Sequence, residues 1–176
     1  MIEIREYREE DRKTVEDICR ITDSSNLDDD VLLTLYCHYY IEKEEENCFV
    51  ATDNDRAIGY IISTLNYEKW KRDFISYYLD KASDKVRKSG LDSISFYSPF
   101  SSNYPSHLHI DILPSYERMG IGHRLMDRLI KSLKEKGSLG LMLGVNSENT
   151  KAVSFYKKYG FSQLDNNSSV FGIKLS

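Results

Sequence analysis

The segment Pro114-Ser115-Tyr116-Glu117-Arg118-Met119-Gly120-Ile121-Gly122-His123-Arg124-Leu125 joins a short apolar strand to an amphipathic helix. Before it, apolar residues alternate with polar ones and predict a half-buried strand that ends at Pro114: Leu108, Ile110 and Ile112. After the glycines, apolar residues recur at helical spacing: Ile121, Leu125, Met126, Leu129, Ile130 and Leu133. The pattern therefore predicts a helix that begins at or just before Gly120.

Such a junction is suited to holding a phosphate. The first backbone N–H groups of a helix have no partner within the helix, and the helix dipole is positive at this end. Glycines also let an anion approach the backbone closely. The segment lacks the Gly-Lys-Ser/Thr of a P-loop, and Leu125 stands where a dinucleotide fingerprint has its third glycine. The alternative is an ordinary strand-to-helix turn that uses glycine for backbone freedom.

A second motif, Asn149-Thr150-Lys151-Ala152-Val153-Ser154-Phe155-Tyr156-Lys157-Lys158-Tyr159-Gly160-Phe161, follows a strand-like run over 139–145. Together the two motifs resemble the GNAT superfamily of acetyl-CoA-dependent N-acetyltransferases. The family has Arg or Gln, two residues, Gly, one residue and Gly or Ala in the first signature. The second has Asn, two residues and Ala, then Phe-Tyr and Gly-Phe. One departure is that Glu117 occupies the family's Arg or Gln position, with an arginine only at Arg118.

Length and charge set bounds on the class of protein. The 176 residues suffice for one core, and no Pro-, Gly- or Ser-rich linker divides them, so we expect a single domain over 1–176. A net charge of −4 gives no global attraction to nucleic acid or to an anionic membrane. The acidic clusters 28–30 and 44–46 are expected to be solvated, or alternatively to attract a cationic substrate.

Neither a signal region nor a membrane span is evident in the sequence, so a cytoplasmic location is expected. The three cysteines, Cys19, Cys37 and Cys48, have no Cys-x-x-Cys spacing. This argues against a disulfide framework and a zinc cluster, and predicts buried thiols.

The first third of the chain predicts strand, helix, helix and hairpin. A strand near 2–7 precedes a helix with Val15, Ile18, Cys19 and Ile21 on one side. A second helix after the acids 28–30 carries Val31, Leu32, Leu35, Tyr36, Tyr39 and Tyr40. A hairpin follows, with strands over 48–52 and 57–65.

The interval 68–106 is longer than the connection that the family usually makes between its third and fourth strands. Apolar residues predict a helix in its first part: Trp70, Phe74, Ile75, Tyr78 and Leu79. An irregular loop is expected over 93–105. We expect this insertion to shape the cleft for the acetyl acceptor; the alternative is extra core or a dimer surface.

Alternating strands and helices indicate an α/β sandwich, which closes with a helix near 149–159 and strands near 161–164 and 170–175. The resemblance implies a GNAT-type three-layer fold with a mixed central sheet of about seven strands. In that fold two central strands splay apart and acetyl-CoA lies between them. Here those strands are 107–113 and 139–145.

The resemblance also implies which residues bind acetyl-CoA. Ile112 offers backbone groups to the pantetheine, the segment 118–124 cradles the pyrophosphate, and an N–H near Ile110 or Asp111 polarises the thioester oxygen. Asn149 contacts the pantetheine arm or caps its helix, in which case Ser147 is an alternative cap. The full set of expected cofactor residues is Ile110, Asp111, Ile112, Arg118, Met119, Gly120, Ile121, Gly122, His123, Arg124, Asn149, Ala152, Phe155 and Tyr156.

Three residues are the catalytic candidates. Tyr156 matches the family tyrosine that protonates the departing CoA thiolate. His109 and Asp111 lie with His107 on one face of the strand. His109 has a suitable ordinary pKa for the base that takes the amine proton, and Asp111 either orients His109 or binds a cationic acceptor; Asp111 or water is the alternative base. The alternatives are a hydrogen-bonded structural trio or a metal site. The family needs no metal, so none is expected.

The sequence thus predicts an acetyl-CoA-dependent N-acetyltransferase. A primary amine, by preference that of a small molecule, attacks the thioester directly in a ternary complex. An aromatic acceptor wall is expected among Tyr36, Tyr39, Tyr40, Tyr77, Tyr78, Tyr97 and Tyr104. Monomer and homodimer both remain open. The alternative is a degenerate, non-catalytic GNAT-fold module that binds CoA weakly or binds a protein partner, and Glu117 is its main support.

Overall fold

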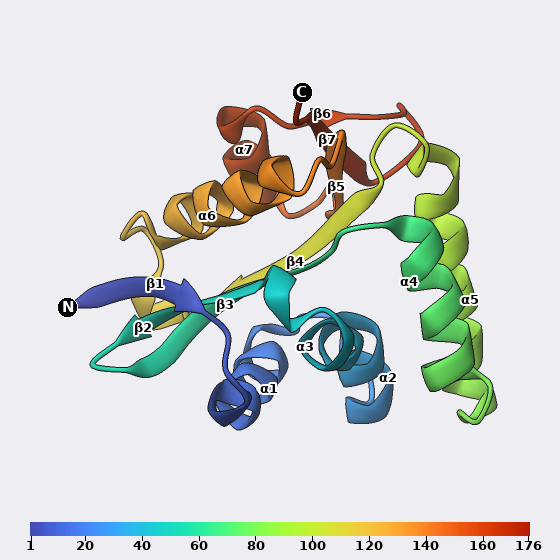
Figure 1. Cartoon of the computed structure of the whole chain (residues 1–176), viewed down its shortest axis with the longest axis horizontal. Coiled ribbons are helices and arrows are strands. Elements are labelled where there is room, and N and C mark those ends of the chain that lie inside the picture. Colours follow the sequence, from blue (N-terminus) through green and yellow to red (C-terminus); the bar gives the residue numbers. More distant parts are fainter.

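A seven-stranded sheet forms the middle layer of the molecule (Figure 1), and the computed structural model describes residues 1–176. The strand order is β1-β2-β3-β4-β5-β7-β6, and only β4 and β5 pair in parallel. The strands are β1 Ile2–Glu6, β2 Cys48–Asp53, β3 Arg56–Thr64, β4 Ser106–Ile112, β5 Gly140–Gly144, β6 Ser162–Gln163 and β7 Val170–Lys174. The prediction of a mixed sheet of about seven strands is confirmed.

Helices cover both faces of this sheet (Figure 1). The helices are α1 Arg12–Thr22, α2 Asp29–Leu33, α3 Tyr39–Lys43, α4 Tyr67–Phe74, α5 Asp84–Tyr97, α6 Ile121–Glu135 and α7 Thr150–Tyr159. Helices α6 and α7 pack on one face, while α1 to α5 share a core on the other. Strand β3 serves both cores, since Tyr60 and Ile62 lie in one and Ile61 lies in the other. The three-layer sandwich is confirmed.

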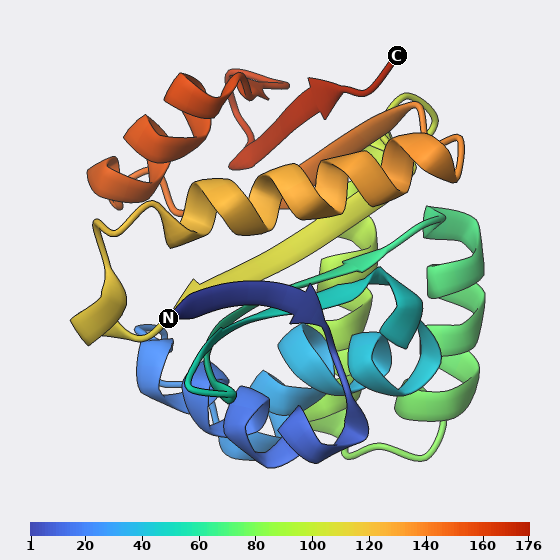
Figure 2. The same cartoon turned by 60° about the vertical axis from the view of Figure 1, so that its left-hand side comes forward.

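The second predicted helix is interrupted in its middle. A π-helical turn over Thr34–His38 lies between α2 and α3, and a second one over Ile75–Leu79 follows α4. Helix α5 then runs beside α4 (Figure 2). No helix combines the length and the apolar character needed to cross a membrane.

Two sequence expectations about elements are wrong. The irregular loop expected over 93–105 is helical in its first part, because α5 extends to Tyr97 and a 3₁₀ turn follows over Ser98–Phe100. The hydroxyl of Ser83 caps α5 by accepting the Val86 N–H at 3.3 Å. Ile21 is 60% exposed instead of buried, because it lies in the last turn of α1 away from the sheet.

The acidic cluster 44–46 is not wholly solvated as expected. Glu44 is only 2% exposed. Its carboxylate accepts four hydrogen bonds, from Tyr39, Asn47, Thr64 and the Leu65 N–H. A buried carboxylate needs such donors, and these tie α3 to the end of β3. The three cysteines are buried free thiols, as predicted.

Candidate functional site

The parallel strands β4 and β5 separate after two residue pairs. Ser106 pairs with Leu141 and His107 with Met142, whereas the rest of β4 pairs only with β3. The N–H of Leu113, just after β4, donates to the carbonyl of Ile58 in line with β3 at 2.9 Å. Because backbone groups alternate in direction along a strand, the N–H of Asp111 also faces β3, whereas those of Ile110 and Ile112 face the gap. The predicted splay is confirmed, and Ile110 is better placed than Asp111 to offer an N–H to a ligand.

A glycine loop follows β4 and leads into α6. Gly120 has a φ of +73° and is the N-cap residue of α6, and Arg118 also has a left-handed φ of +63°. The first intrahelical bond runs from the Arg124 N–H to the Gly120 carbonyl. The N–H groups of residues 121–123 therefore have no partner within the helix, and an anion can accept from them.

A cavity of about 500 Å³, here the loop cavity, lies between this loop and α7. It is lined by Thr22, Ile110, Asp111, Ile112, Tyr116, Glu117, Arg118, Gly120, Ile121, Gly122, His123, Asn149, Lys151, Ala152, Phe155 and Tyr156. A Cβ on Gly122 would lie 3.3 Å from the Phe155 ring and 3.5 Å from Ile112 Cδ1, so glycine keeps this wall open. Most of the sequence-predicted cofactor residues therefore meet in one cavity.

Two of the predicted cofactor residues lie outside the loop cavity. The guanidinium of Arg124 donates to the carbonyl of Ile2 at 3.1 Å, on the β1 side of α6. The side chain of Met119 is 56% exposed. Among the residues expected to cradle the pyrophosphate, Arg118 and His123 are the ones with polar side chains that do line the loop cavity.

The unusual Glu117 has a cationic partner. Its carboxylate forms an ion pair with Lys151 in the first turn of α7. Both residues line the loop cavity. Lys151 therefore offsets the negative charge that Glu117 brings to the predicted pyrophosphate region.

Asn149 caps α7, which is one of its two expected roles, and Ser147 does not. The Asn149 Oδ1 accepts the Ala152 N–H at 3.1 Å. The side chain also lines the loop cavity, so the cap leaves Nδ2 as the atom able to donate to a ligand. Capping and ligand binding are compatible in this geometry.

A second cavity of about 360 Å³, here the central cavity, continues from the loop cavity through the gap between β4 and β5. Both cavities are lined by Thr22, Ile110, Asp111, Asn149, Ala152 and Tyr156. Burial, together with the charge of Asp111, raises the pKa of the Tyr156 hydroxyl above its ordinary value. Tyr156 is therefore a hydrogen-bond donor at neutral pH.

Asp111 is held from the side opposite to the cavity. The buried Tyr60 hydroxyl donates to Asp111 Oδ2 at 2.6 Å. Burial raises the pKa of Asp111 to about 6, against the hydrogen bonds from Tyr60 and Thr22, which lower it, and Asp23 adds to the rise. At neutral pH Asp111 is an ionised carboxylate that can take up a proton near pH 6.

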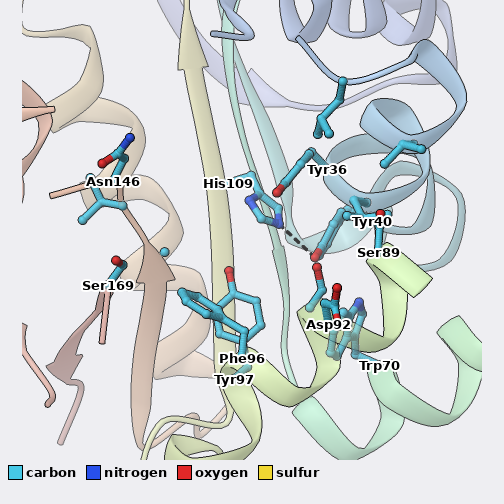
Figure 3. A pocket seen from close by; sticks show the side chains of 16 residues that line it. Tyr36, Tyr40, Trp70, Ser89, Asp92, Phe96, Tyr97, His109, Asn146 and Ser169 are labelled. Atoms are coloured by element: carbon cyan, nitrogen blue, oxygen red, sulfur yellow. Dashed lines mark hydrogen bonds between the residues drawn. The ribbon is translucent and has the colours of Figure 1, made fainter. Parts of the chain in front are cut away.

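His109 is hydrogen-bonded to Tyr40 (Figure 3). The Tyr40 hydroxyl lies 3.0 Å from His109 Nε2 and 2.7 Å from His107 Nε2. A hydroxyl has one proton, so it donates to one ring and accepts from the other. Burial lowers the pKa of His109 to about 3, and that of His107 well below its ordinary value. Both rings are neutral, and Asp111 is the stronger proton acceptor on this strand.

A third cavity, here the aromatic cavity, measures about 480 Å³ and continues from the central cavity past His109 (Figure 3). The two share Tyr36, His109, Gly144, Val145 and Asn146. Of the seven tyrosines expected in an acceptor wall, only Tyr36, Tyr40 and Tyr97 line the aromatic cavity. Tyr39 is buried in the core and Tyr77 is 65% exposed. The three cavities adjoin one another, since neighbouring cavities share lining residues, and together they are here called the passage. No group of three or more His, Cys, Asp or Glu side chains is arranged to hold a metal ion.

A family model described as Acetyltransferase (GNAT) family matches residues 6–161. The chain belongs to the GNAT acetyltransferase family. The family uses acetyl-CoA. The structure titled SsHAT has the same fold with a TM-score of 0.86 and 27% identity, over 99% of this chain and 98% of that chain.

Two further similarities are informative. The Salmonella typhimurium protein yncA, solved with its cofactor acetyl-CoA, shares the fold at a TM-score of 0.62 and 16% identity, over 100% of this chain and 95% of that chain. The [ribosomal protein bS18]-alanine N-acetyltransferase of Haemophilus influenzae is 44% identical over 57 residues, which are 32% of this chain and 38% of that protein. This chain thus matches well under two thirds of the length of that curated relative.

Several residues of this GNAT site escaped the sequence analysis. Thr22 and Lys151, from α1 and α7, line the loop cavity, and Tyr60 of β3 reaches the site only through its hydrogen bond to Asp111. Phe96 lies on α5, the helix that was expected to be partly loop. Only Lys151 carried a usable signal, since it lies within the second motif and is opposite in charge to Glu117.

Proposed function

We propose that this protein transfers the acetyl group of acetyl-CoA to the primary amine of a small molecule, by direct attack within a ternary complex. One observation carries the proposal: Asp111 and Tyr156 line both the loop cavity and the central cavity, where the two meet in the gap between β4 and β5. A base and a hydrogen-bond donor thus flank the position where amine and thioester would meet.

Each residue has a defined role in this proposal. Asp111 accepts a proton from the ammonium group and frees the nitrogen lone pair, which attacks the thioester carbon. The Ile110 N–H donates to the oxygen as negative charge develops on it. The nitrogen then releases its second proton to water, the carbon–sulfur bond breaks, and Tyr156 donates a hydrogen bond to the departing sulfur, which takes up a proton from water. The net products are the amide, the CoA thiol and one proton.

Tyr156 acts mainly as a hydrogen-bond donor in this scheme. A phenol of pKa about 10 and a thiol of pKa about 8.5 make full proton transfer unfavourable by about 2 kcal/mol. Burial raises the pKa of Tyr156 further, so complete transfer is still less favourable. A hydrogen bond to the sulfur stabilises the developing thiolate without that cost.

The walls of the aromatic cavity support a small acceptor. They include side chains of α4 and α5, from the insertion expected over 68–106, such as Trp70 and Phe96. A cavity between packed helices suits a small molecule better than an extended peptide. A protein α-amine is the second candidate, because the bS18-alanine N-acetyltransferase of H. influenzae is similar over 57 residues.

The test combines product mass with thiol release. Purified protein and acetyl-CoA are mixed with a panel of primary amines and with a peptide that begins with alanine. Acetylation of small amines with intersecting initial-rate plots supports the proposal. Acetylation of the peptide alone supports the second candidate, and parallel plots contradict direct attack. Lack of acetyl-CoA binding supports the non-catalytic module instead.

A further inference from the structure

The aromatic cavity is walled by rings on several sides (Figure 3). Five aromatic side chains and His109 line it: Tyr36, Tyr40, Trp70, Phe96 and Tyr97. They come from the helical segments 34–43, α4 and α5, and His109 comes from β4. Aromatic walls of this kind bind planar rings through edge and face contacts.

These walls are already ordered by contacts among themselves. The Tyr36 and Tyr40 rings meet His109 edge-on, with centroids 5.0 and 5.1 Å apart. Tyr40 is also fixed by its hydrogen bonds to the two imidazoles. A ring that enters the cavity therefore meets preformed partners and orders few side chains on binding.

Phe96 and Gly144 set the width of the cavity between α5 and β5. A Cβ on Gly144 would lie 2.8 Å from the Phe96 ring. The absence of a side chain at Gly144 thus lets Phe96 lie close to the strand. Phe96 is 37% exposed, so its ring forms part of the rim of the cavity.

The charges near the passage orient a cationic ligand. Asp92 is the only charged residue that lines the aromatic cavity, and it is exposed. Its Oδ2 forms an ion pair with Lys88 Nζ at 3.1 Å, which offsets its charge. The central cavity has two carboxylates, Asp23 and Asp111. An ammonium group is therefore favoured in the central cavity, and an uncharged ring in the aromatic cavity.

The spacing along β4 limits the distance between the two ends of such a ligand. His109 touches both cavities, and Asp111 lies two residues further along the same face. Two residues of strand span about 7 Å. A linker of two or three carbon atoms between ring and nitrogen matches this separation.

We propose that the acetyl acceptor is an arylalkylamine, with its aromatic ring in the aromatic cavity and its amine beside Asp111. This inference rests on the proposed function and specifies its substrate class. The aromatic pairing predicts that 2-phenylethylamine is acetylated with a kcat/KM about two- to tenfold above that of 2-cyclohexylethylamine, its saturated counterpart. Putrescine, which has no ring, is expected to be the poorest substrate of the three.

Binding has a readout that does not depend on turnover. Trp70 is the single tryptophan of the chain and lines the aromatic cavity. Titration with 2-phenylethylamine is expected to change its fluorescence in a saturable manner, and titration with putrescine is not. Phe96→Ala should weaken this binding and remove the preference for the phenyl over the cyclohexyl amine.

Leu91→Ala is the matched control for Phe96→Ala, because Leu91 is an exposed apolar residue on the same helix that does not line the cavity. It should leave both readouts unchanged. Equal or better acetylation of putrescine, with no change in Trp70 fluorescence, would overturn the arylalkylamine assignment but leave the acetyltransferase proposal intact. Acetylation of no amine, and no acetyl-CoA binding in calorimetry, would overturn both.

Discussion

Burial of the Asp111 carboxylate disfavours its charge and also makes it a stronger base. The carboxylate is largely withdrawn from water, and burial raises its pKa to about 6. Tyr60 holds one oxygen at 2.6 Å and so fixes the side chain for proton transfer. The residues around it are Cys19, Thr22, Asp23, Tyr60 and Tyr156, none of which is a cation. Such an environment is unfavourable for a charge and favourable for a base that works near neutrality.

Asp111→Asn is predicted to remove the base. Wild-type kcat/KM should rise with pH up to about 6, where Asp111 ionises, and then level off. In the variant, kcat/KM at pH 8 should be about 10²- to 10⁴-fold lower, and the rise of kcat/KM up to pH 6 should be absent. The pH–rate profile checks this. A variant that keeps this rise would show that another group, or water, takes the proton.

The same substitution is predicted to stabilise the protein at high pH. Folding raises the pKa of Asp111 from its ordinary value of about 3.9, so the folded chain binds more protons between pH 4 and 6. Relative to the ionised form, protonated Asp111 stabilises the fold fully below pH 4, and this stabilisation is lost as the pH rises through about 6. Above that pH the buried charge lowers the free energy of unfolding by about 2 to 3 kcal/mol. Asp111→Asn should therefore raise Tm at pH 8 by about 4 to 10 °C and little at pH 4. Thermal melts of the variant and the wild type at pH 4 and pH 8 test this prediction. A Tm of the variant below that of the wild type at pH 8 would contradict it.

Tyr156→Phe is predicted to lower kcat by about 100-fold or more while the affinity for acetyl-CoA stays within about twofold. The hydroxyl is protonated throughout the assay range because burial raises its pKa. Tyr159→Phe is the matched control on α7, since its hydroxyl bonds Asp127 at 2.5 Å and does not line the passage. Unchanged turnover in Tyr156→Phe would remove the residue from the mechanism.

At the scale of elements, Glu44 joins three parts of the fold at the end of β3. Its four hydrogen bonds come from α3, from the turn before β2 and from the end of β3. Each oxygen of the Glu44 carboxylate accepts two of these hydrogen bonds. Glu44→Gln replaces one oxygen by an NH₂ group, which cannot accept, so two of the four hydrogen bonds are lost. We predict a loss of about 2 to 4 kcal/mol of unfolding free energy, measured in urea, with unchanged affinity for acetyl-CoA.

Glu45→Gln is the control for this prediction, because Glu45 is exposed next to Glu44. It should change the unfolding free energy by no more than about 0.5 kcal/mol. Equal effects of the two variants would show that the Glu44 network does not stabilise the fold.

The elements nearest the two motifs were predictable from the sequence. Regular apolar spacing identified β4 and α6, while a strand-like apolar run identified β5 and the second motif identified α7. The second half of α5 was missed, since its serines and glycine favour loops in isolation. Packing overrides that preference: Val86, Ile94 and Tyr97 are buried, and a Cβ on Gly90 would lie 2.5 Å from Leu79.

The candidate site was predictable where it is local and was missed where it is assembled from distant segments. The glycine loop, Asn149 and Tyr156 lie in motifs with fixed spacing. Thr22 and Phe96 reach the passage from other elements, and Tyr60 acts on it through Asp111. No local sequence pattern reports these contacts. The basicity of the two candidate bases also depends on burial. In sequence His109 has the ordinary pKa that suits a base, yet burial lowers the pKa of His109 to about 3 and raises that of Asp111 to about 6.

At the scale of the whole molecule, the fold creates a passage by pulling two parallel strands apart. Helix α6 presents its open N-terminus at one end, and the insertion with α4 and α5 supplies the rings at the other. Asp111 and Tyr156 lie between them. In the proposed direct transfer both ends are occupied at once, so the proposed reaction requires a ternary complex.

The most direct test is calorimetric titration of acetyl-CoA into the wild type, Gly120→Asp and Gly137→Asp. Gly120 and Gly137 both have left-handed φ values, +73° and +80°, and neither Cβ position has a neighbour within 4 Å, so the two substitutions strain the backbone alike. Only Gly120 lies on the loop cavity. We predict micromolar binding to the wild type and to Gly137→Asp, with at least tenfold weaker binding to Gly120→Asp. No binding to the wild type at millimolar acetyl-CoA, or equal losses in both variants, would contradict this prediction.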